Sequence, residues 1–452
     1  MKIKSINIVE LFGLHNYDIY FDYKENIKII HAPNGYGKTT VLRLLKDIVN
    51  GKFFEVNLTP FKSYRIDFDN DMAVEVIKEM KSNDDTNLKT MNNKPSFIYR
   101  ISKSGKIKEF NMGNRANYSA FVEGKLPLNL IEDNMPFLRR VGPRIWLDAN
   151  TGEKLTYDEV INTYGELLFL NKELSDNLRY IREQIPIHII NANRLIKSDI
   201  LNDNYKNELG ARRENILQSV VVYSKELADI IETSLAKSGS LTQELDRTFP
   251  ARLIQMMTCE SNDNIISIER IIQELEELER RRMRLEEVGL LTSTTNTSVQ
   301  PTTAIDESTI KVLSLYIKDT KDKLNIFNEV ERKINLMKEI INKRFINKVM
   351  KINRLKGFVF ELPDNTLLSP EKLSSGEQNE LVLIYELLFK SEPNSLILID
   401  EPEISLHIAW QQEFLNDMLK ISEITGINLL IATHSPDIIN GRWDLTTGLG
   451  EI

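Results

Sequence analysis

The spacing of apolar and polar positions divides the chain into three stretches, and the first is rich in strands. From residue 1 to about residue 110, short runs of β-branched and aromatic residues alternate with polar turns, and one helix is expected at 38–48. These runs favour an antiparallel sheet beside a first strand–helix unit. The expected strands are Lys2–Val9, Tyr17–Asp22, Ile27–His31, Tyr64–Phe68, Ala73–Ile77, Ser96–Ile101 and Lys106–Phe110.

The second stretch, from Tyr157 to Asn353, has helical periodicity, broken by a strand-like run at 187–190. Its last apolar positions step by three or four residues and predict one helix from about 308 to 353, which would be roughly 65–70 Å long. A helix of that length needs a partner, so we expect an antiparallel hairpin with the preceding helix, or a bundle folded onto the core. The other expected helices are Glu159–Gln184, Glu208–Ala236 and Ile265–Val288, and Leu291–Thr303 is expected to be an exposed loop.

The third stretch begins at Phe358, where alternation of strands and helices returns and continues to the end. The helical stretch is therefore expected to be an insertion between two halves of one α/β domain. The predicted domains are 1–156, 157–356 and 357–452. An arginine run at 280–282, with Arg284, lies among glutamates and is interpreted as a solvated helix face.

Composition narrows the possible classes of protein. The chain of 452 residues is 41% hydrophobic and 27% charged, which is typical of a soluble folded protein. Its single cysteine, Cys259, excludes an intramolecular disulfide framework. The net charge of −8 disfavours a protein that coats nucleic acid, although a local basic groove stays possible. We expect no membrane span, no secretory leader and a cytoplasmic location.

The strongest chemical pattern is Ala-Pro-Asn-Gly-Tyr-Gly-Lys-Thr-Thr at 32–40, between an expected strand and an expected helix. This is the context of a phosphate-binding loop, in which glycines let backbone N–H groups surround a phosphate and the helix N-terminus adds positive charge. Ala32 replaces the usual first glycine. Lys38 is expected to contact the β- and γ-phosphates, and Thr39 to hold Mg²⁺. The predicted ATP-binding residues are Asn34, Gly35, Tyr36, Gly37, Lys38, Thr39 and Thr40.

A second pattern, Leu-Ile-Leu-Ile-Asp-Glu at 396–401, is an apolar run that ends in two carboxylates. A buried strand can place Asp400 beside Mg²⁺, and Glu401 is then expected to orient or deprotonate the attacking water. Two further segments complete the set. They are Leu-Ser-Ser-Gly-Glu-Gln at 373–378 and Leu-Leu-Ile-Ala-Thr-His-Ser-Pro at 429–436.

Together these segments resemble the ABC-type ATPase head of transporters, SMC-like repair proteins and the overcoming-lysogenization-defect family. The resemblance implies an α/β P-loop ATPase head with an N-terminal antiparallel β subdomain and a long, coiled-coil-like helical insertion. It implies ATP and Mg²⁺ as ligands, a D-loop at Glu403–His407, and His434 as a catalytic switch histidine at the γ-phosphate. It also implies a signature loop that caps the nucleotide of the opposite protomer, formed by Ser374, Ser375, Gly376 and Glu377.

The resemblance also suggests which kind of ATPase this is. A transporter subunit would have a shorter helical subdomain, and a chromosome-maintenance head usually has a far longer coiled coil. The chain looks more like the ATPase subunits of the Septu and PARIS anti-phage systems. Each of those works with a separately encoded nuclease. We therefore expect this chain to restrain or activate a separately encoded nuclease or toxin, as an oligomer of at least two heads, with a nucleic acid or a phage protein as its trigger. The alternatives are an SMC-like DNA-repair ATPase and an ATPase unrelated to defence.

Three features have no assigned role at this stage. No Q-loop glutamine is identifiable. Arg194 follows the strand-like run at 187–190 and is a weak candidate for contact with phosphate. The segment Leu-Asp-Arg-Thr-Phe-Pro-Ala-Arg at 245–252 looks familiar from standalone ATPases of this kind, but its residues predict no chemistry.

Overall fold

The chain folds into two compact units, which are described separately. The first contains residues 1–192, 391–404 and 411–452, and the second contains 193–390 and 405–410. The predicted boundaries at 156 and 356 stay predictions, and the units group residues differently, with 157–192 in the first and 357–390 in the second. The computed structural model describes residues 1–22, 25–78, 97–111, 128, 131–132, 135, 137–149, 154–157, 159–160, 172–190, 196–198, 216–258, 267–291, 306–404 and 406–450.

The first unit contains the expected antiparallel sheet, which has six strands in the order β2-β1-β4-β5-β6-β7. Alternate side chains are buried, because one face of the sheet covers the core. All of the strands expected in this sheet are confirmed to within a few residues. The strands are β1 (Ile3–Leu11), β2 (His15–Tyr20), β4 (Ser63–Phe68), β5 (Met72–Lys78), β6 (Phe97–Lys103) and β7 (Lys106–Asn111).

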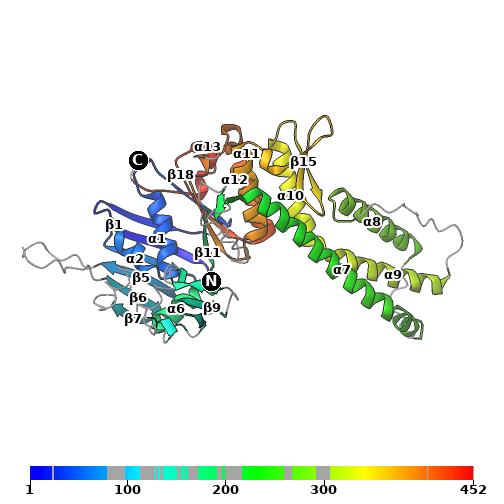
Figure 1. The fold of residues 1–452 in the computed structure, drawn as a ribbon, viewed down its shortest axis with the longest axis horizontal. Coiled ribbons are helices and arrows are strands. Elements are labelled where there is room, and N and C mark those ends of the chain that lie inside the picture. Colours follow the sequence, from blue (N-terminus) through cyan, green and yellow to red (C-terminus); the bar gives the residue numbers. More distant parts are fainter. Residues whose placement is uncertain are drawn as a thin grey trace, which may run out of the picture. The chain divides into compact units, whose positions relative to one another are not determined.

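A five-stranded parallel sheet, in the order β11-β17-β18-β3-β19, forms the other layer of this unit (Figure 1). Strands β17 and β18 have apolar, buried interiors, as expected of strands covered on both faces, and their polar residues lie at the strand ends. The strands are β3 (Ile27–His31), β11 (Ile187–Ile190), β17 (Leu396–Asp400), β18 (Asn428–Thr433) and β19 (Thr446–Gly448). The other elements are α1 (Lys38–Asn50), α2 (Phe53–Leu58), β8 (Leu138–Gly142), β9 (Ile145–Asp148), β10 (Lys154–Thr156), α6 (Lys172–Gln184), α12 (Ile408–Thr425), whose first turn belongs to the second unit, and α13 (Pro436–Ile439).

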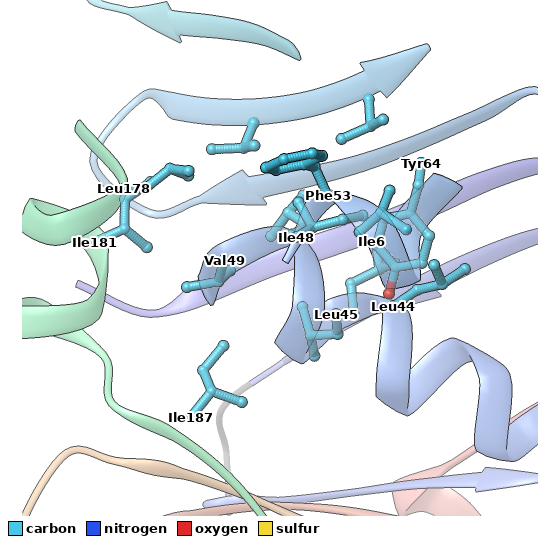
Figure 2. Close-up of a cluster of buried hydrophobic side chains, with 14 of the residues drawn as sticks. Ile6, Leu44, Leu45, Ile48, Val49, Phe53, Tyr64, Leu178, Ile181 and Ile187 are labelled. Carbon is cyan, nitrogen blue, oxygen red and sulfur yellow. The ribbon is translucent and has the colours of Figure 1, made fainter. Parts of the chain in front are cut away.

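Helix α1 lies at the centre of the core of the first unit. Its residues Leu45 and Ile48 are fully buried. Figure 2 shows the α1 side chains clustered with Tyr64 of β4 and with Leu178 and Ile181 of α6. The Tyr64 hydroxyl also donates to the Val41 carbonyl at 3.1 Å. The helix that starts at the phosphate loop is therefore held on several sides.

The second unit contains the helical stretch, but the expected single helix at 308–353 is wrong. The chain forms two helices, α9 (Glu307–Asn325) and α10 (Asn328–Arg344), followed by strand β14 (Val349–Asn353). Asn347, with a left-handed φ of 57°, follows the end of α10. Beyond Asn347, side chains are alternately exposed and buried, as in a strand: Val349 is exposed and Met350 is buried. The longest helix is instead α7 (Ser219–Thr258), of 40 residues.

The expected antiparallel pairing of the last two helical segments is also wrong. Helix α8 (Ile268–Glu287) contacts α9, and the Glu287 carbonyl at its end accepts from Lys338 of α10 at 3.4 Å, so α8 runs parallel to the segment formed by α9 and α10. The Lys321 amine pairs with Glu274 at 3.0 Å, whereas Asn325 accepts from Arg281 at 3.1 Å, further along both helices. The antiparallel partner of α9 is α7, which lies beside it in Figure 1.

The unassigned segment 245–252 fastens α7 to α9. Pro250 lies inside α7 and cannot donate a backbone hydrogen bond. The Arg252 guanidinium reaches back to the Leu245 carbonyl at 2.8 Å and holds both carboxylate oxygens of Asp319 at 2.6 and 2.7 Å. The Asp319 side chain is only 7% exposed. These contacts give the segment a structural role.

The arginine run on α8 is only partly a solvated face. Arg280 and Arg282 pair with Glu276 and Glu279 on the same helix, as expected. Arg281 instead donates to the Leu324 carbonyl at 3.0 Å and helps to hold α8 against α9. The remaining elements of this unit are β12 (Ile196–Ser198), β13 (Ile216–Gln218), β15 (Gly357–Glu361), β16 (Leu367–Leu368) and α11 (Ser375–Tyr385). In the part of the chain that the structure describes, no helix is long and apolar enough to cross a membrane.

Candidate nucleotide-binding site

The loop at 32–37 connects β3 to α1 and has the backbone of an anion cradle. Gly35 and Gly37 have φ angles of 91° and 80°, in the region that favours glycine. A Cβ on Gly37 would lie 2.9 Å from Cδ2 of Leu11, so this glycine is also required by space. Gly37 caps α1 without a side-chain hydrogen bond, and the first turn carries no acidic residue. The N-terminal N–H groups of α1 can therefore bind an anion.

Lys38 is buried and curls back over the loop. Its amine donates to the carbonyl oxygens of Ala32 at 2.8 Å and Pro33 at 3.2 Å. Ala32, in place of the usual first glycine, does not have a positive φ, and so its Cβ causes no backbone strain. Alanine therefore fits the loop that this lysine closes.

Asp400 at the end of β17 has the surroundings of a Mg²⁺ ligand. Burial raises the pKa of its carboxyl group, while a hydrogen bond with the Thr39 hydroxyl and the charges of Arg43 and Lys38 oppose that rise. Its Oδ1 atom is buried and has no hydrogen-bond partner among the described residues. A buried carboxylate oxygen beside a hydroxyl fits Mg²⁺, which typically takes one or two protein oxygen ligands together with phosphates. Within the described ranges, no group of three or more His, Cys, Asp or Glu side chains could hold a metal.

Glu401 begins a tight turn after β17. Its φ of 44° is in the left-handed region, which is strained for a residue with a side chain. Its backbone N–H donates to the Ala432 carbonyl of β18 at 2.9 Å. Such strain is found more often at functional sites than elsewhere.

His434 follows β18 and is held by Glu403, a residue that was predicted to lie in a D-loop and to be the next candidate after Glu401 for the catalytic carboxylate. The Nδ1 atom of His434 lies 2.8 Å from Oε1 of Glu403. The same oxygen accepts from the Thr433 hydroxyl at 2.7 Å and from the His434 backbone N–H at 2.8 Å. The only sequence sign of this contact was a second carboxylate shortly after the apolar strand.

The register of the parallel sheet brings these residues to one edge. Asp400 pairs with Ala432 on β18, and Thr433 pairs with His31 on β3. The carboxyl ends of the three strands are therefore level, and the residues that follow them lie at the same edge. Ligands of open α/β sheets bind at this edge. The phosphate loop, Asp400, Glu401 and His434 thus lie at one edge of the sheet within the first unit.

Aromatic side chains lie beside the phosphate loop, and Phe12, His15 and Tyr17 were not among the residues predicted from the sequence. Phe12 is 40% exposed, and its Cε2 atom lies 3.2 Å from where a Cβ on Gly37 would be. The Tyr36 ring lies 5.4 Å from that of His15, and its carbonyl accepts from the Tyr17 hydroxyl at 2.7 Å. Of the other expected binding residues, Asn34 and Gly35 are exposed and Thr40 is half-buried.

The expected signature residues begin α11, in the second unit. Ser374 caps the helix and forms a reciprocal capping box with Glu377, whose carboxylate is also held by Lys348 at 2.6 and 2.8 Å. Burial alone would raise the pKa of Glu377, but these contacts outweigh it and lower the pKa. Ser375 and Gly376 follow in the first turn, and the space beside Gly376 is open. Arg194 lies outside the described residues.

A glycine-rich loop between a parallel strand and a helix, with an acidic strand end beside it, defines a P-loop nucleotide-binding domain. Residues 290–440, about a third of the chain, match a family model described as "AAA domain, putative AbiEii toxin, Type IV TA system". This part, which includes Asp400 and His434, is therefore similar to an AAA-type ATPase domain. The phosphate loop lies outside the matched range.

The other comparisons give weaker likenesses. The chain is 14% identical to a Pyrococcus furiosus Smc head domain bound to the C-terminal domain of ScpA, over 99% of this chain and 93% of that one, with a TM-score of 0.33. It is 9% identical to the Thermotoga maritima SMC head domain, over 100% and 96%, with a TM-score of 0.32. These scores are too low to support a function. No curated protein matches the chain.

Proposed function

We propose that this protein is an ABC-type ATPase that binds and hydrolyses ATP with Mg²⁺. The observation that supports the proposal is the convergence of the phosphate loop, Asp400, Glu401 and His434 at one edge of the parallel sheet. No single residue of this set would by itself identify an ATP-binding site. A buried, partly unpartnered carboxylate level with a glycine-rich loop fits a nucleotide with its cation better than it fits a purely structural role.

Each residue has a distinct task in this proposal. The backbone N–H groups of 34–40 surround the β-phosphate, and Lys38 leaves the carbonyl of Ala32 to meet the β- and γ-phosphates. Thr39 and Asp400 hold Mg²⁺, which when bound neutralises charge that develops on the phosphates. Glu401 orients or deprotonates the attacking water, and His434 faces the γ-phosphate.

In this proposal, a complete ATP site needs residues from two copies of the chain. By its resemblance to ABC-type heads, the signature segment at 374–377 completes the nucleotide site of a second copy. We infer an assembly of at least two heads that closes around ATP. The open space beside Gly376 at the start of α11 supports this, because a phosphate can approach the helix N-terminus there.

The biological setting that we propose is bacterial anti-phage defence, in the cytoplasm. The ATPase would restrain or activate a separately encoded nuclease or toxin after a nucleic-acid or phage-protein trigger. The support is the resemblance to such ATPase subunits, together with a matched family whose description names a toxin of a toxin–antitoxin system. Co-purification with the products of neighbouring genes tests this part. A bound nuclease or toxin supports it, whereas DNA-end-stimulated turnover with no bound protein contradicts it.

The chemical proposal is tested with two variants and two controls. Lys38→Ala should lose ATP hydrolysis because the phosphates lose their cation, and Glu401→Gln should bind ATP with at least a 100-fold lower kcat. Lys4→Ala and Glu392→Gln, at exposed positions of the same unit, should behave like the parent. Steady-state phosphate release and a nucleotide-binding titration measure both effects. Parental turnover in Glu401→Gln would show that Glu401 is not the catalytic carboxylate.

A further inference from the structure

Glu403 is bound to His434 in a way that fixes the histidine ring. Its Oε1 atom accepts from Thr433 and from two nitrogens of His434, the backbone N–H and the ring Nδ1, at 2.7–2.8 Å. An ionised carboxylate only accepts hydrogen bonds, so the Nδ1 atom in this contact carries the proton. The opposite ring nitrogen, Nε2, is not engaged by this carboxylate and is therefore the nitrogen that could accept a hydrogen bond from a ligand.

The two side chains of this pair differ in how far they are exposed to solvent. The Glu403 side chain is 6% exposed, whereas the His434 side chain is 42% exposed. The Oε2 atom of Glu403 is buried and has no hydrogen-bond partner in the described part of the chain. The carboxylate is thus inside the protein and the ring lies at the surface of the site.

The turn after β17 gives two neighbouring carboxylates opposite environments. Glu401 is half-buried and enters the turn with a left-handed backbone, while Glu403 lies two residues later in the turn Pro402–Ile404 and is directed inward. The Glu403 carbonyl also accepts from the Gln411 amide at 3.3 Å, and Gln411 in turn accepts from the Ser435 hydroxyl at 3.0 Å. Gln411 therefore bridges the Glu403 backbone to Ser435, the residue after His434.

We propose that Glu403 is the positioning residue of His434, and that Glu401 alone of the two carboxylates acts on water. This inference rests on the proposed function. Glu403 keeps the Nδ1–H of the ring on its carboxylate, so that Nε2 points to the γ-phosphate of bound ATP. When the ring is protonated, both nitrogens donate, one to Glu403 and one to phosphate. The carboxylate acts through the ring and does not touch the nucleotide.

A double-mutant cycle tests the role in turnover. Glu403→Ala should lower kcat roughly 10–100-fold, as for other groups that orient a functional histidine, with the KM for ATP within about twofold of the parent. Glu403→Gln, whose amide oxygen still accepts from Nδ1, should recover part of the loss. Adding Glu403→Ala to His434→Ala should cost nothing more. Additive losses, or a loss carried mainly by KM, would overturn the inference.

A nuclear magnetic resonance measurement tests the contact without any need for activity. In ¹⁵N-histidine-labelled protein without nucleotide, the His434 signal, identified by its loss in His434→Ala, should show a protonated Nδ1. That signature should disappear in Glu403→Ala and persist in Glu392→Ala, an exposed control in the same unit. A proton on Nε2 with Nδ1 bare in the parent would overturn the inference. If the parent does not hydrolyse ATP, the proposed function fails, and the tautomer alone decides whether Glu403 positions the ring.

Discussion

At the scale of single residues, Asp400 shows how a binding site opposes stability. Its Oδ1 atom is buried without a hydrogen-bond partner among the described residues, and burial raises the pKa of the group above 3.8. A carboxyl whose pKa is higher in the folded than in the unfolded protein favours folding only while it is protonated. That contribution is lost as the pH rises through the folded-state pKa. The nucleotide-free protein is therefore expected to be less stable because of this residue at neutral pH.

This predicts the behaviour of Asp400→Asn. In a chelator and without nucleotide, the variant should be more stable than the parent at pH 7 by up to about 1 kcal/mol, because the desolvated charge is removed while solvent and the nearby cations limit the gain. Chemical denaturation from pH 4 to pH 8 measures the difference, which should shrink toward the acid end as Asp400 of the parent becomes protonated. Addition of Mg²⁺ and ATP should raise the melting temperature of the parent only. A variant less stable than the parent at pH 7 would contradict the prediction.

At the scale of elements, the backbones of α7 and β15 are in such close contact at Gly357 that a side chain has no room there. Gly357 starts β15 with a φ of 72°, and a Cβ there would lie 1.7 Å from the Ser224 carbonyl oxygen of α7. The Ser224 hydroxyl accepts from the Phe358 N–H at 3.1 Å and donates to the Lys356 carbonyl at 2.5 Å. This strand and the long helix therefore depend on a glycine at one position.

Gly357→Ala should destabilise the protein by roughly 2–5 kcal/mol, through strain at a positive φ and displacement of a backbone. Gly239→Ala is the matched control, since Gly239 lies within α7 with open space around it. That control should be neutral or stabilising by up to about 1 kcal/mol. Thermal unfolding of both variants measures the contrast, and equal melting temperatures would contradict the packing described here.

At the scale of the whole molecule, the proposed catalytic residues are divided between the two compact units. The phosphate loop belongs to the first unit, and the signature segment that begins at Ser374 belongs to the second. In a symmetric pair of heads, each site would take its phosphate loop from one copy and its signature segment from the other. Two inactive variants with defects in different segments should then complement one another.

Mixing variants tests this arrangement. Lys38→Ala damages the phosphate loop, and Gly376→Glu adds a carboxylate at the start of α11, where a Cβ would meet no atom within 4 Å. Each should be inactive alone, and an equimolar mixture should recover about a quarter of the parental ATPase, since half of the pairs contain one intact site of two. Two samples of the same variant mixed together are the control. No recovery, although light scattering shows mixed dimers, would contradict shared sites.

Much of the site was predictable because its signals are local in the sequence. The strands Ile27–His31 and Leu396–Asp400 were expected at the bounds that the structure has. Each is a short apolar run whose end is marked by the next few residues, the glycine-rich loop after the first and the carboxylates after the second. The six-stranded sheet was predictable from alternation for the same reason. The roles of Lys38 and Asp400 stay predictions until they are measured.

The tertiary structure decided what depends on residues far apart in the chain. The spacing of apolar residues from 308 onward did not show that the helix divides near Phe327 or that it ends before Asn347. A short apolar run can fit one face of a helix or one face of a strand, so spacing alone did not separate the end of α10 from β14. Nor could it show that α8 and α9 are parallel, since a long linker permits either direction. Glu403 and His434 lie 31 positions apart, and only the pairing of β17 with β18 brings them together. The sequence by itself determined which residues can carry chemistry, and the fold decided which of them meet.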